Sequence, residues 1–354
     1  MLQNVSKLQV QESKNIVDIE KIIQWRDSSY SNDLYIAAVS WLDLFTWLDG
    51  NPATERGIIE RFSLKERPAQ TMLRLFEAWT LLSQKDGRYH VSNEARRFLS
   101  QKSPENVASY IATMKYKSSV REIYDVLRFD ESDTWHVERG IGTTWDDLMQ
   151  TDDFADLNTR GMEERGRIFA PDLTRLLDCS NDTKMLDIGG GSGIYSAHLL
   201  NSNERLSSTI LERPPVDDLA KACLQEKGLL DSRAFVSTCD MFVDSFPADA
   251  SLHLYSHVLH NWGFEKVALL LAKSHEALAP GGRIAVYSCH PDDRNGQPAP
   301  ALEAEYSVLL TTSYEGRCYS FEDMRKLFEG AGFQGIEYYR SICNRSLIIG
   351  HKST

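Results

Sequence analysis

The chain has 354 residues, enough for two domains of ordinary size. Its 39 basic and 51 acidic residues give a net charge of −12. This charge argues against a general binder of nucleic acid or anionic membranes, because both require clustered positive charge. No apolar run approaches the roughly 18 residues of a membrane span, and the N-terminal residues lack the apolar stretch of a signal peptide. Six cysteines without a CxxC pair fit a reducing environment. We therefore expect a cytoplasmic protein.

The N-terminal third has a helical pattern followed by a small hairpin. Residues 34–48 are apolar nearly all round, which predicts one buried helix before the break at residues 49–52. A short helix capped by Thr54, an amphipathic helix at 69–82 and two strands around Asp86 and Gly87 follow. This order is typical of a winged helix. The helix at 69–82 carries one basic residue, so a dimerisation or packing domain is favoured over a DNA reader.

From residue 184 onward the pattern changes to alternating strands and helices, after several helices in residues 103–178. Such alternation predicts a mostly parallel sheet covered on both faces. The last two strands are joined by only five residues, so one of them is expected to run antiparallel. The predicted strands are residues 185–189, 207–212, 234–238, 251–258, 282–288, 335–340 and 346–351.

A glycine-rich turn follows the first of these strands. Gly189, Gly191 and Gly193 form G-x-G-x-G, which lets the backbone approach a ligand closely. The dinucleotide spacing G-x-G-x-x-G is absent in both frames. Asp187, two residues before the first glycine, suits a ligand with a cationic amino group, such as S-adenosylmethionine (SAM). A structural glycine turn is the alternative.

Two further acids follow the next two strands. Glu212 ends the second strand, where a ribose diol is usually bound. Asp240 follows the third strand and can accept a hydrogen bond from an adenine amino group, while Met241 and Phe242 can pack on the ring. Together with the glycine turn, these residues predict a ligand crevice at the switch point of an open sheet.

Two histidines follow the fourth strand, at His257 and His260. A metal site would need a third ligand, for which His290 is the nearest candidate, and we expect no metal. A general base is the stronger hypothesis: a phenol with a pKa of about 10 is almost wholly protonated at pH 7, and a neutral imidazole can remove its proton. One of the two histidines is then expected to be structural.

Five motifs occur in order along the chain: LDIGGGSG (186–193), LERPPV (211–216), CDMF (239–242), SHVLHNW (256–262) and ALAPGGRIAVYS (277–288). Together they resemble the plant-type small-molecule O-methyltransferases and their bacterial relatives in natural-product pathways. The resemblance implies a class I, SAM-dependent, Rossmann-like seven-stranded domain, preceded by a mostly helical winged-helix domain. It also implies a homodimer whose partner contributes to the substrate pocket. We expect residues 1–102 to form the dimerisation domain, 103–165 the linker and pocket helices, and 166–354 the SAM-binding domain.

The resemblance also assigns roles to single residues. It implies that His260 is the catalytic base, that His257 is structural and that Met162 lines the pocket near the methyl donor, with Asn261 as a second substrate contact. The product is then S-adenosylhomocysteine. The implied SAM contacts are Gly189, Gly191, Glu212, Asp240, Met241, Ser256 and Trp262, beside Asp187 and Phe242 from the pattern above.

The sequence departs from the plant pattern around His260. Asn261 stands where the family usually has Asp, and the two glutamates that orient the histidine fall at Tyr287 and Cys318. Glu303, Glu305 or Glu315 are the candidate replacements. A histidine without an acidic partner is a weaker base. The favoured function is O-methylation of a small aromatic secondary metabolite. Methylation at carbon or nitrogen, a SAM-binding protein that transfers no methyl group, and a DNA-binding regulator are the alternatives.

Overall fold

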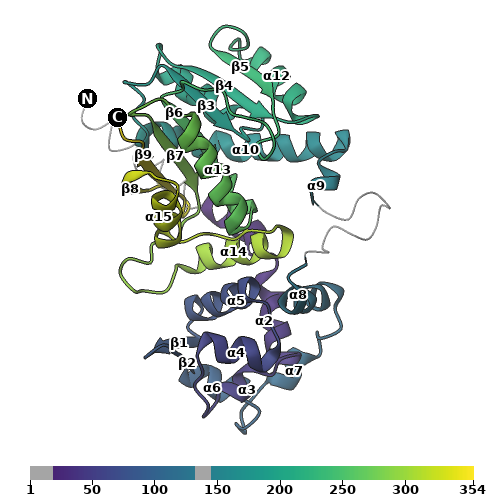
Figure 1. Ribbon diagram of the computed structural model, residues 1–354. Helices are drawn as coiled ribbons and strands as arrows, with labels where there is room; N and C mark the ends of the chain where they lie inside the picture. Colours follow the sequence, from purple (N-terminus) through teal and green to yellow (C-terminus); the bar gives the residue numbers. More distant parts are fainter. Residues whose placement is uncertain (1–18, 132–144) are drawn as a thin grey trace, which may run out of the picture. The chain divides into compact units, whose positions relative to one another are not determined.

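The computed structural model describes residues 19–131 and 145–354, and the chain forms two compact units (Figure 1). The N-terminal unit contains residues 19–131 and 293–318, and the C-terminal unit contains residues 145–292 and 319–354. The segment 293–318 thus packs with the N-terminal helices. The sequence-based prediction that it belongs to the SAM-binding domain is wrong for this segment. In the described residues, no helix is both long and apolar enough to cross a membrane.

The N-terminal unit is helical apart from one hairpin. Residues 19–27 are helical. A helix from the later segment, α14 (Ala301–Ser313), packs against α5 (Glu66–Ala78) and α2 (Ser31–Ser40). The other elements are α3 (Leu44–Leu48), α4 (Glu55–Phe62), β1 (Leu82–Lys85), β2 (Arg88–Val91), α6 (Asn93–Leu99), α7 (Ala108–Ala112) and α8 (Ser118–Phe129).

The single helix predicted for residues 34–48 is wrong, because the chain breaks it into α2 and α3. Asp43 adopts a left-handed conformation with φ 49°, which ends the helical path. The Trp41 indole donates a hydrogen bond to the Lys115 carbonyl at 3.2 Å and anchors the end of α2. The turn lets Leu34 and Phe45 both reach the same buried core, in which each is at most 3% exposed.

The predicted cap and hairpin are confirmed. The Thr54 hydroxyl accepts a hydrogen bond from the Gly57 amide at 3.1 Å and caps α4. Strands β1 and β2 pair antiparallel, with positive φ values at Asp86 and Gly87 in the connecting turn. Two positive φ values are what a tight two-residue hairpin turn requires. The helix–helix–hairpin order is therefore present in this unit.

The C-terminal unit contains a seven-stranded sheet with the strand order β5-β4-β3-β6-β7-β9-β8. All seven predicted strands are confirmed. Strand β9 pairs antiparallel with both β7 and β8, as the short final connection required. The elements are α9 (Trp145–Leu148), α10 (Asp152–Leu176), β3 (Lys184–Ile188), α11 (Ile194–Ser202), β4 (Ser207–Glu212), α12 (Val216–Glu226), β5 (Ala234–Thr238), β6 (Leu252–Ser256), the 3₁₀ turn η1 (Leu259–Asn261), α13 (Phe264–Ala277), β7 (Arg283–Ser288), α15 (Phe321–Gly330), β8 (Gln334–Arg340) and β9 (Ser346–His351).

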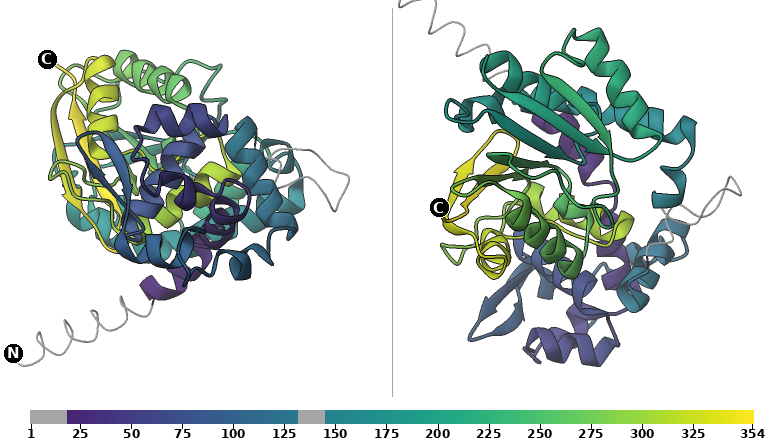
Figure 2. Two further views of the ribbon diagram at one scale, coloured as in Figure 1. Left: turned by 90° about the horizontal axis from the view of Figure 1, so that it is seen from below. Right: turned by 45° about the horizontal axis from the view of Figure 1, so that its top comes forward.

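Helices cover this sheet in two groups (Figure 2). Helix α10 packs on α11 and α12, and α13 packs on α15. The contact between α10 and α11 is close at Gly166, where a Cβ would lie 2.4 Å from the Ile194 side chain. Because β3 to β7 run parallel, the loops that follow them meet at one edge of the sheet.

A buried histidine in β6 couples the stability of this unit to pH. His253 is fully buried beside Phe246, and neither ring nitrogen has a hydrogen-bond partner among the described residues. Burial, and to a smaller extent Lys352, lowers the pKa of His253 to about 3. The unfolded chain therefore binds a proton that the folded chain does not, and stability falls as the pH drops below about 6.5.

Replacing this histidine is expected to flatten the pH dependence. The linkage predicts that His253 alone costs about 1 kcal/mol of unfolding free energy between about pH 7 and about pH 5.5. His253→Leu removes that cost, so urea midpoints of the variant should differ less between the two pH values than those of the wild type. An unchanged difference between the two midpoints would contradict the role of His253.

Candidate functional site

The loop after β3 is shaped by glycines in the left-handed region. Gly189, Gly191 and Gly193 have φ values of 66°, 57° and 73°. A side chain at Gly190 would lie within 2.6 Å of the Asp187 carboxyl group. In the described structure, no heavy atom outside residues 190–192 lies within 4 Å of the place that a Cβ of residue 191 would take. The loop is therefore tight on its inner side and open at Gly191.

Asp187 supports this loop from inside the sheet. The Ser196 hydroxyl donates to its Oδ2 at 2.7 Å and contacts the Ser208 hydroxyl at 2.8 Å. Asp187 Oδ1 has no hydrogen-bond partner among the described residues, and the residue is fully buried. Burial raises the pKa of the Asp187 carboxyl to about 6, against the opposing effect of Ser196. An orphaned carboxylate oxygen under the loop suits a ligand with a hydrogen-bond donor or a positive charge.

Glu212, at the end of β4, joins the second strand to the same loop. Its Oε1 accepts a hydrogen bond from the Gly191 amide at 2.9 Å, and its Oε2 accepts one from the Arg213 amide at 3.2 Å. Burial raises the pKa of the Glu212 carboxyl to about 7, while the two amides act in the opposite direction. The carboxylate thus stands beside the open side of the loop.

The predicted adenine contacts form a compact turn after β5. Asp240 Oδ1 accepts from the Phe242 amide at 2.9 Å, and the Met241 carbonyl accepts from the Lys273 ammonium at 2.6 Å. The Phe242 ring packs edge-on against Trp262, with centroids 4.7 Å apart. The fold therefore brings together two aromatic residues that the sequence separates by twenty positions.

His257 follows Ser256, which ends β6, and is buried in an aromatic cluster. Its φ of 59° is left-handed, and its amide donates to the Tyr287 carbonyl at 2.8 Å. Its ring lies 6.0 Å, centroid to centroid, from both Phe169 and Tyr195. Neither ring nitrogen has a partner among the described residues, and burial lowers the pKa of His257 far below its usual value. This histidine is therefore neutral.

His260 lies on η1 and is 3% exposed. Its Nδ1 is 2.5 Å from the hydroxyl oxygen of Ser288, the last residue of β7. The ring of His257 lies 5.6 Å from that of His260. Asn261 ends the same turn, and the Trp262 carbonyl that follows accepts a hydrogen bond from the Tyr319 hydroxyl. These contacts hold the histidine at the edge where the parallel strands end.

The sequence did not predict Ser288 as the partner of His260, because the resemblance placed an orienting glutamate at position 287, one residue earlier. The Tyr287 hydroxyl points elsewhere and contacts the Ser341 hydroxyl at 2.7 Å. Cys318 belongs to the N-terminal unit. The signal that could have found Ser288 is its place at the end of a parallel strand next to β6.

The glutamates considered as replacements, Glu303, Glu305 and Glu315, also belong to the N-terminal unit. The two oxygens of Glu305 accept hydrogen bonds from the Trp79 indole at 3.0 Å and from the Gln24 amide at 3.2 Å. This carboxylate is therefore used within its own unit.

The remaining candidates are placed as follows. Met162 lies half-buried on α10, the helix that also carries Phe169. The His290 Nδ1 is 3.0 Å from the Tyr319 carbonyl, and burial lowers the pKa of His290 to about 4. Across residues 19–131 and 145–354, no three side chains of the metal-binding types cluster as a metal site would require.

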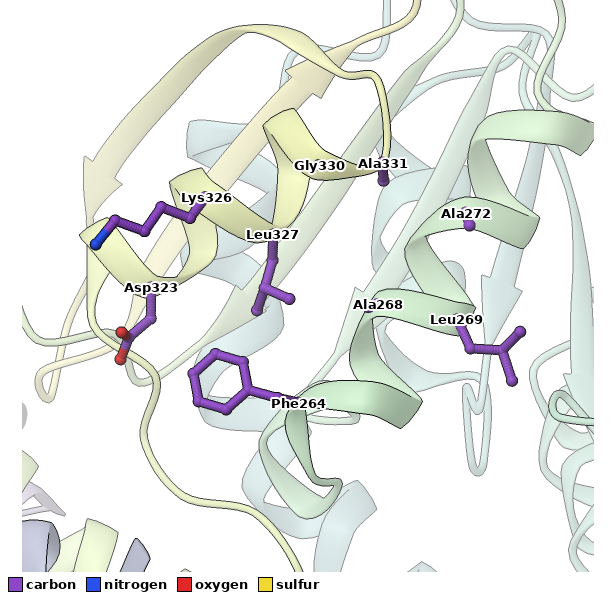
Figure 3. Close-up of a pocket in the computed structure, with 9 residues that line it drawn as sticks. All are labelled: Phe264, Ala268, Leu269, Ala272, Asp323, Lys326, Leu327, Gly330 and Ala331. Atoms are coloured by element: carbon purple, nitrogen blue, oxygen red, sulfur yellow. The ribbon is translucent and has the colours of Figure 1, made fainter. Parts of the chain in front are cut away.

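A groove of about 650 Å³ lies between α13 and α15 (Figure 3). Apolar side chains such as Phe264, Leu269 and Leu327 line it, and Asp323 and Lys326 stand at one side. None of the residues predicted to bind SAM or substrate lines this groove. The candidate site is instead the edge formed by the ends of β3, β4, β5 and β6.

The residues at this edge fit SAM. The open glycine loop admits a ligand backbone, and the orphaned Asp187 oxygen suits a positively charged amino group. The Glu212 carboxylate suits a ribose diol, and the turn from Asp240 to Phe242 suits an adenine ring.

Comparison with known proteins shows the family to which the chain belongs. The family model described as "O-methyltransferase domain" matches residues 120–334. The tetracenomycin polyketide synthesis 8-O-methyl transferase TcmO of Streptomyces glaucescens is 27% identical over 94% of this chain and 96% of its own length. The L-tyrosine C(3)-methyltransferase of Streptomyces lavendulae is 27% identical over 86% of this chain and 84% of its own.

A solved structure extends the likeness to three dimensions. The O-methyltransferase family 2 protein from Planctomyces limnophilus, in complex with apigenin, superposes with a TM-score of 0.83. It is 26% identical, and the match covers 94% of this chain and 96% of that one. The family match spans more than half of the chain, and the fold and the glycine-loop site agree with it. The chain belongs to the O-methyltransferase domain family and is a SAM-dependent methyltransferase.

Proposed function

We propose that this enzyme methylates a hydroxyl group of a small, aromatic secondary metabolite, with His260 as the general base. The observation that carries the proposal is the placement of His260. Its ring is buried at the edge that also holds the glycine loop, and its Nδ1 is bonded to Ser288. A base held in one orientation beside the methyl donor is what proton removal from a hydroxyl group requires.

In this proposal each residue has a separate task. With Nδ1 bonded to Ser288, His260 accepts the hydroxyl proton at Nε2, and the oxygen then becomes the nucleophile. Bound SAM supplies the methyl group, which is electrophilic because it is attached to a sulfonium sulfur. Met162 and Asn261 contact the acceptor and hold it in line, and such positioning supplies much of the rate.

The proposed cofactor contacts occupy the ends of four neighbouring strands. Gly189 and Gly191 open the loop, and Asp187 interacts with the amino group. Ser256, at the end of β6, is a further cofactor contact in this proposal. The acids and aromatic residues that complete the set are Glu212, Asp240, Met241, Phe242 and Trp262.

Methylation at carbon is the second candidate. The relative from Streptomyces lavendulae that is named as a C(3)-methyltransferase matches this chain as closely as the O-methyl transferase does. A phenolate is nucleophilic at its ring carbons as well as at oxygen, so the same base serves both reactions. Transfer from SAM with a ¹³C-labelled methyl group, followed by NMR of the product, separates the two by the methyl shift.

We also propose that the protein is a homodimer that associates through its N-terminal unit. This unit carries large apolar side chains on its surface, including Trp25 (66% exposed), Tyr110 (79%) and Tyr116 (82%). Exposed aromatic side chains are enriched at protein–protein interfaces. The winged-helix order of α4, α5 and the β1–β2 hairpin suits such a packing domain.

His260→Ala is expected to lower kcat by about 10²- to 10⁴-fold, because the acceptor then keeps its proton. Apigenin serves as the first acceptor to try, and S-adenosylhomocysteine formation is measured by mass spectrometry. His198→Ala, a half-buried histidine on α11, is the control and should keep full activity. A loss below threefold in the His260 variant would exclude it as the base.

Binding of S-adenosylhomocysteine is expected to weaken at acid pH through Glu212. The pKa of this carboxyl group is raised to about 7 in the free enzyme. Protonation of the carboxylate therefore competes with its binding of the ribose diol. The dissociation constant should rise about tenfold between about pH 8 and about pH 6. In Glu212→Gln this pH dependence should be smaller and binding weaker throughout, as titration calorimetry would show.

The control for that experiment is Asp218→Asn, an exposed acid on α12 that pairs with Lys221. It should bind with the pH dependence of the wild type. An equally steep pH dependence in the Glu212 variant would argue against contact between this carboxylate and the cofactor.

Substitution of the exposed tyrosines should give a monomer. Tyr110→Glu together with Tyr116→Glu places two charges in the proposed interface, where burial of unpaired charge is costly. Light scattering coupled to size exclusion should report half the wild-type mass. Val243→Glu, which is 79% exposed in the C-terminal unit, is the matched control and should leave the mass unchanged. Wild-type protein that is already monomeric would end the proposal.

A further inference from the structure

The contact between His260 and Ser288 joins the turn after β6 to the end of β7, two positions that the sequence separates by 28 residues. His260 Nδ1 and Ser288 Oγ are 2.5 Å apart, and the two residues are 3% and 1% exposed. A buried ring nitrogen and a buried hydroxyl both lose water on folding, so each needs a partner inside the protein. The geometry therefore makes this pair an internal hydrogen bond with little access to solvent.

The backbone holds Ser288 in place from both sides. Strand β7 pairs with β6 on one side, with Tyr287 opposite Ser256, so Ser288 emerges at the edge where η1 begins. On the other side β9 pairs with β7, with Ser346 opposite Ser288. The Ser346 hydroxyl donates to the Ser288 carbonyl at 3.4 Å. The position of the hydroxyl is thus set by the centre of the sheet and not by a loop.

We propose that Ser288 is a positioning residue that holds His260 in the tautomer with the proton on Nδ1; the inference rests on the function proposed above. A neutral imidazole carries a single N–H group. When Nδ1–H donates to the Ser288 oxygen, the lone pair lies on Nε2, where the acceptor's proton is received. A serine oxygen still accepts this hydrogen bond after the ring gains its second proton, so the pair persists through proton transfer.

In this enzyme, fixing the tautomer of the histidine is separated from stabilising its positive charge. In serine hydrolases a buried carboxylate both fixes the tautomer and stabilises the imidazolium. At the Nδ1 position of this enzyme, the hydroxyl of Ser288 does the first task without adding a negative charge. Without this acceptor, a buried Nδ1–H group would be unsatisfied, and the proton would move to Nε2. The Nε2 atom would then have no lone pair with which to accept the proton of the substrate hydroxyl group.

The tautomer can be measured without any acceptor. Two-bond ¹H–¹⁵N spectra of protein labelled on histidine nitrogens distinguish the two neutral tautomers, and the His260 signals are those missing in His260→Gln. The wild type is expected to show Nδ1–H, and Ser288→Ala is expected to move toward Nε2–H. Ser274→Ala, a fully buried serine on α13 whose hydroxyl contacts the Tyr255 hydroxyl at 2.7 Å, is the matched control and should leave the His260 signals in place. A wild-type enzyme with its proton on Nε2 would overturn the inference.

Kinetics then tests whether the contact acts through His260. Ser288→Ala should lower kcat about 5- to 150-fold with unchanged binding of S-adenosylhomocysteine, and Ser288→Thr, which keeps the hydroxyl, should recover most of the loss. In the double variant His260→Ala/Ser288→Ala, kcat should match that of His260→Ala alone. Losses that multiply would overturn the positioning role while leaving His260 as the base. A His260→Ala variant with full activity would instead remove the proposed function itself.

Discussion

The hydrogen bond from the Gly191 amide to the Glu212 carboxylate is the contact on which the site depends. It ties the glycine loop after β3 to the end of β4 at 2.9 Å. The loop can take this path because Gly189 and Gly191 have positive φ values and Gly190 leaves room for the Asp187 carboxyl group. One bond between neighbouring parallel strands thus shapes the glycine loop and places an acid beside it.

Burial sets the charge states around this edge. It raises the pKa of the carboxyl groups of Asp187 and Glu212 and lowers the pKa of His257 and His290. All four shifts favour the neutral form, because a charged group loses its hydration in the interior. A site of this kind gains interactions when a charged ligand replaces the missing water, which suits a cationic methyl donor.

The site uses side chains that come from many separate segments. Phe242 and Trp262 follow different strands yet pack edge-on, and Ser288 reaches His260 from β7. The parallel strands explain this convergence, because their carboxyl ends share one edge of the sheet. The same arrangement separates this edge from the groove between α13 and α15, which is lined by other residues.

The local sequence pattern was sufficient to predict most strands and turns of the C-terminal unit. Alternation of apolar segments predicted all seven strands, and a five-residue connection predicted the antiparallel direction of β9. Glycine spacing and acids at strand ends gave the residues that we propose to bind SAM. The helix at 34–48 failed because its apolar pattern is satisfied equally by two helices that meet at Asp43. Periodicity reports burial and cannot by itself locate a left-handed break.

By itself, the amino-acid sequence determined the class of protein, the strands and the family motifs, because these depend on residues close together along the chain. Only the tertiary structure decided that segment 293–318 joins the N-terminal unit and that Ser288, not a carboxylate at position 287, meets His260 Nδ1. A shift of one residue along a strand turns the side chain to the opposite face. The partner of a buried nitrogen therefore depends on strand register and on which strands are neighbours, and both are properties of the folded sheet.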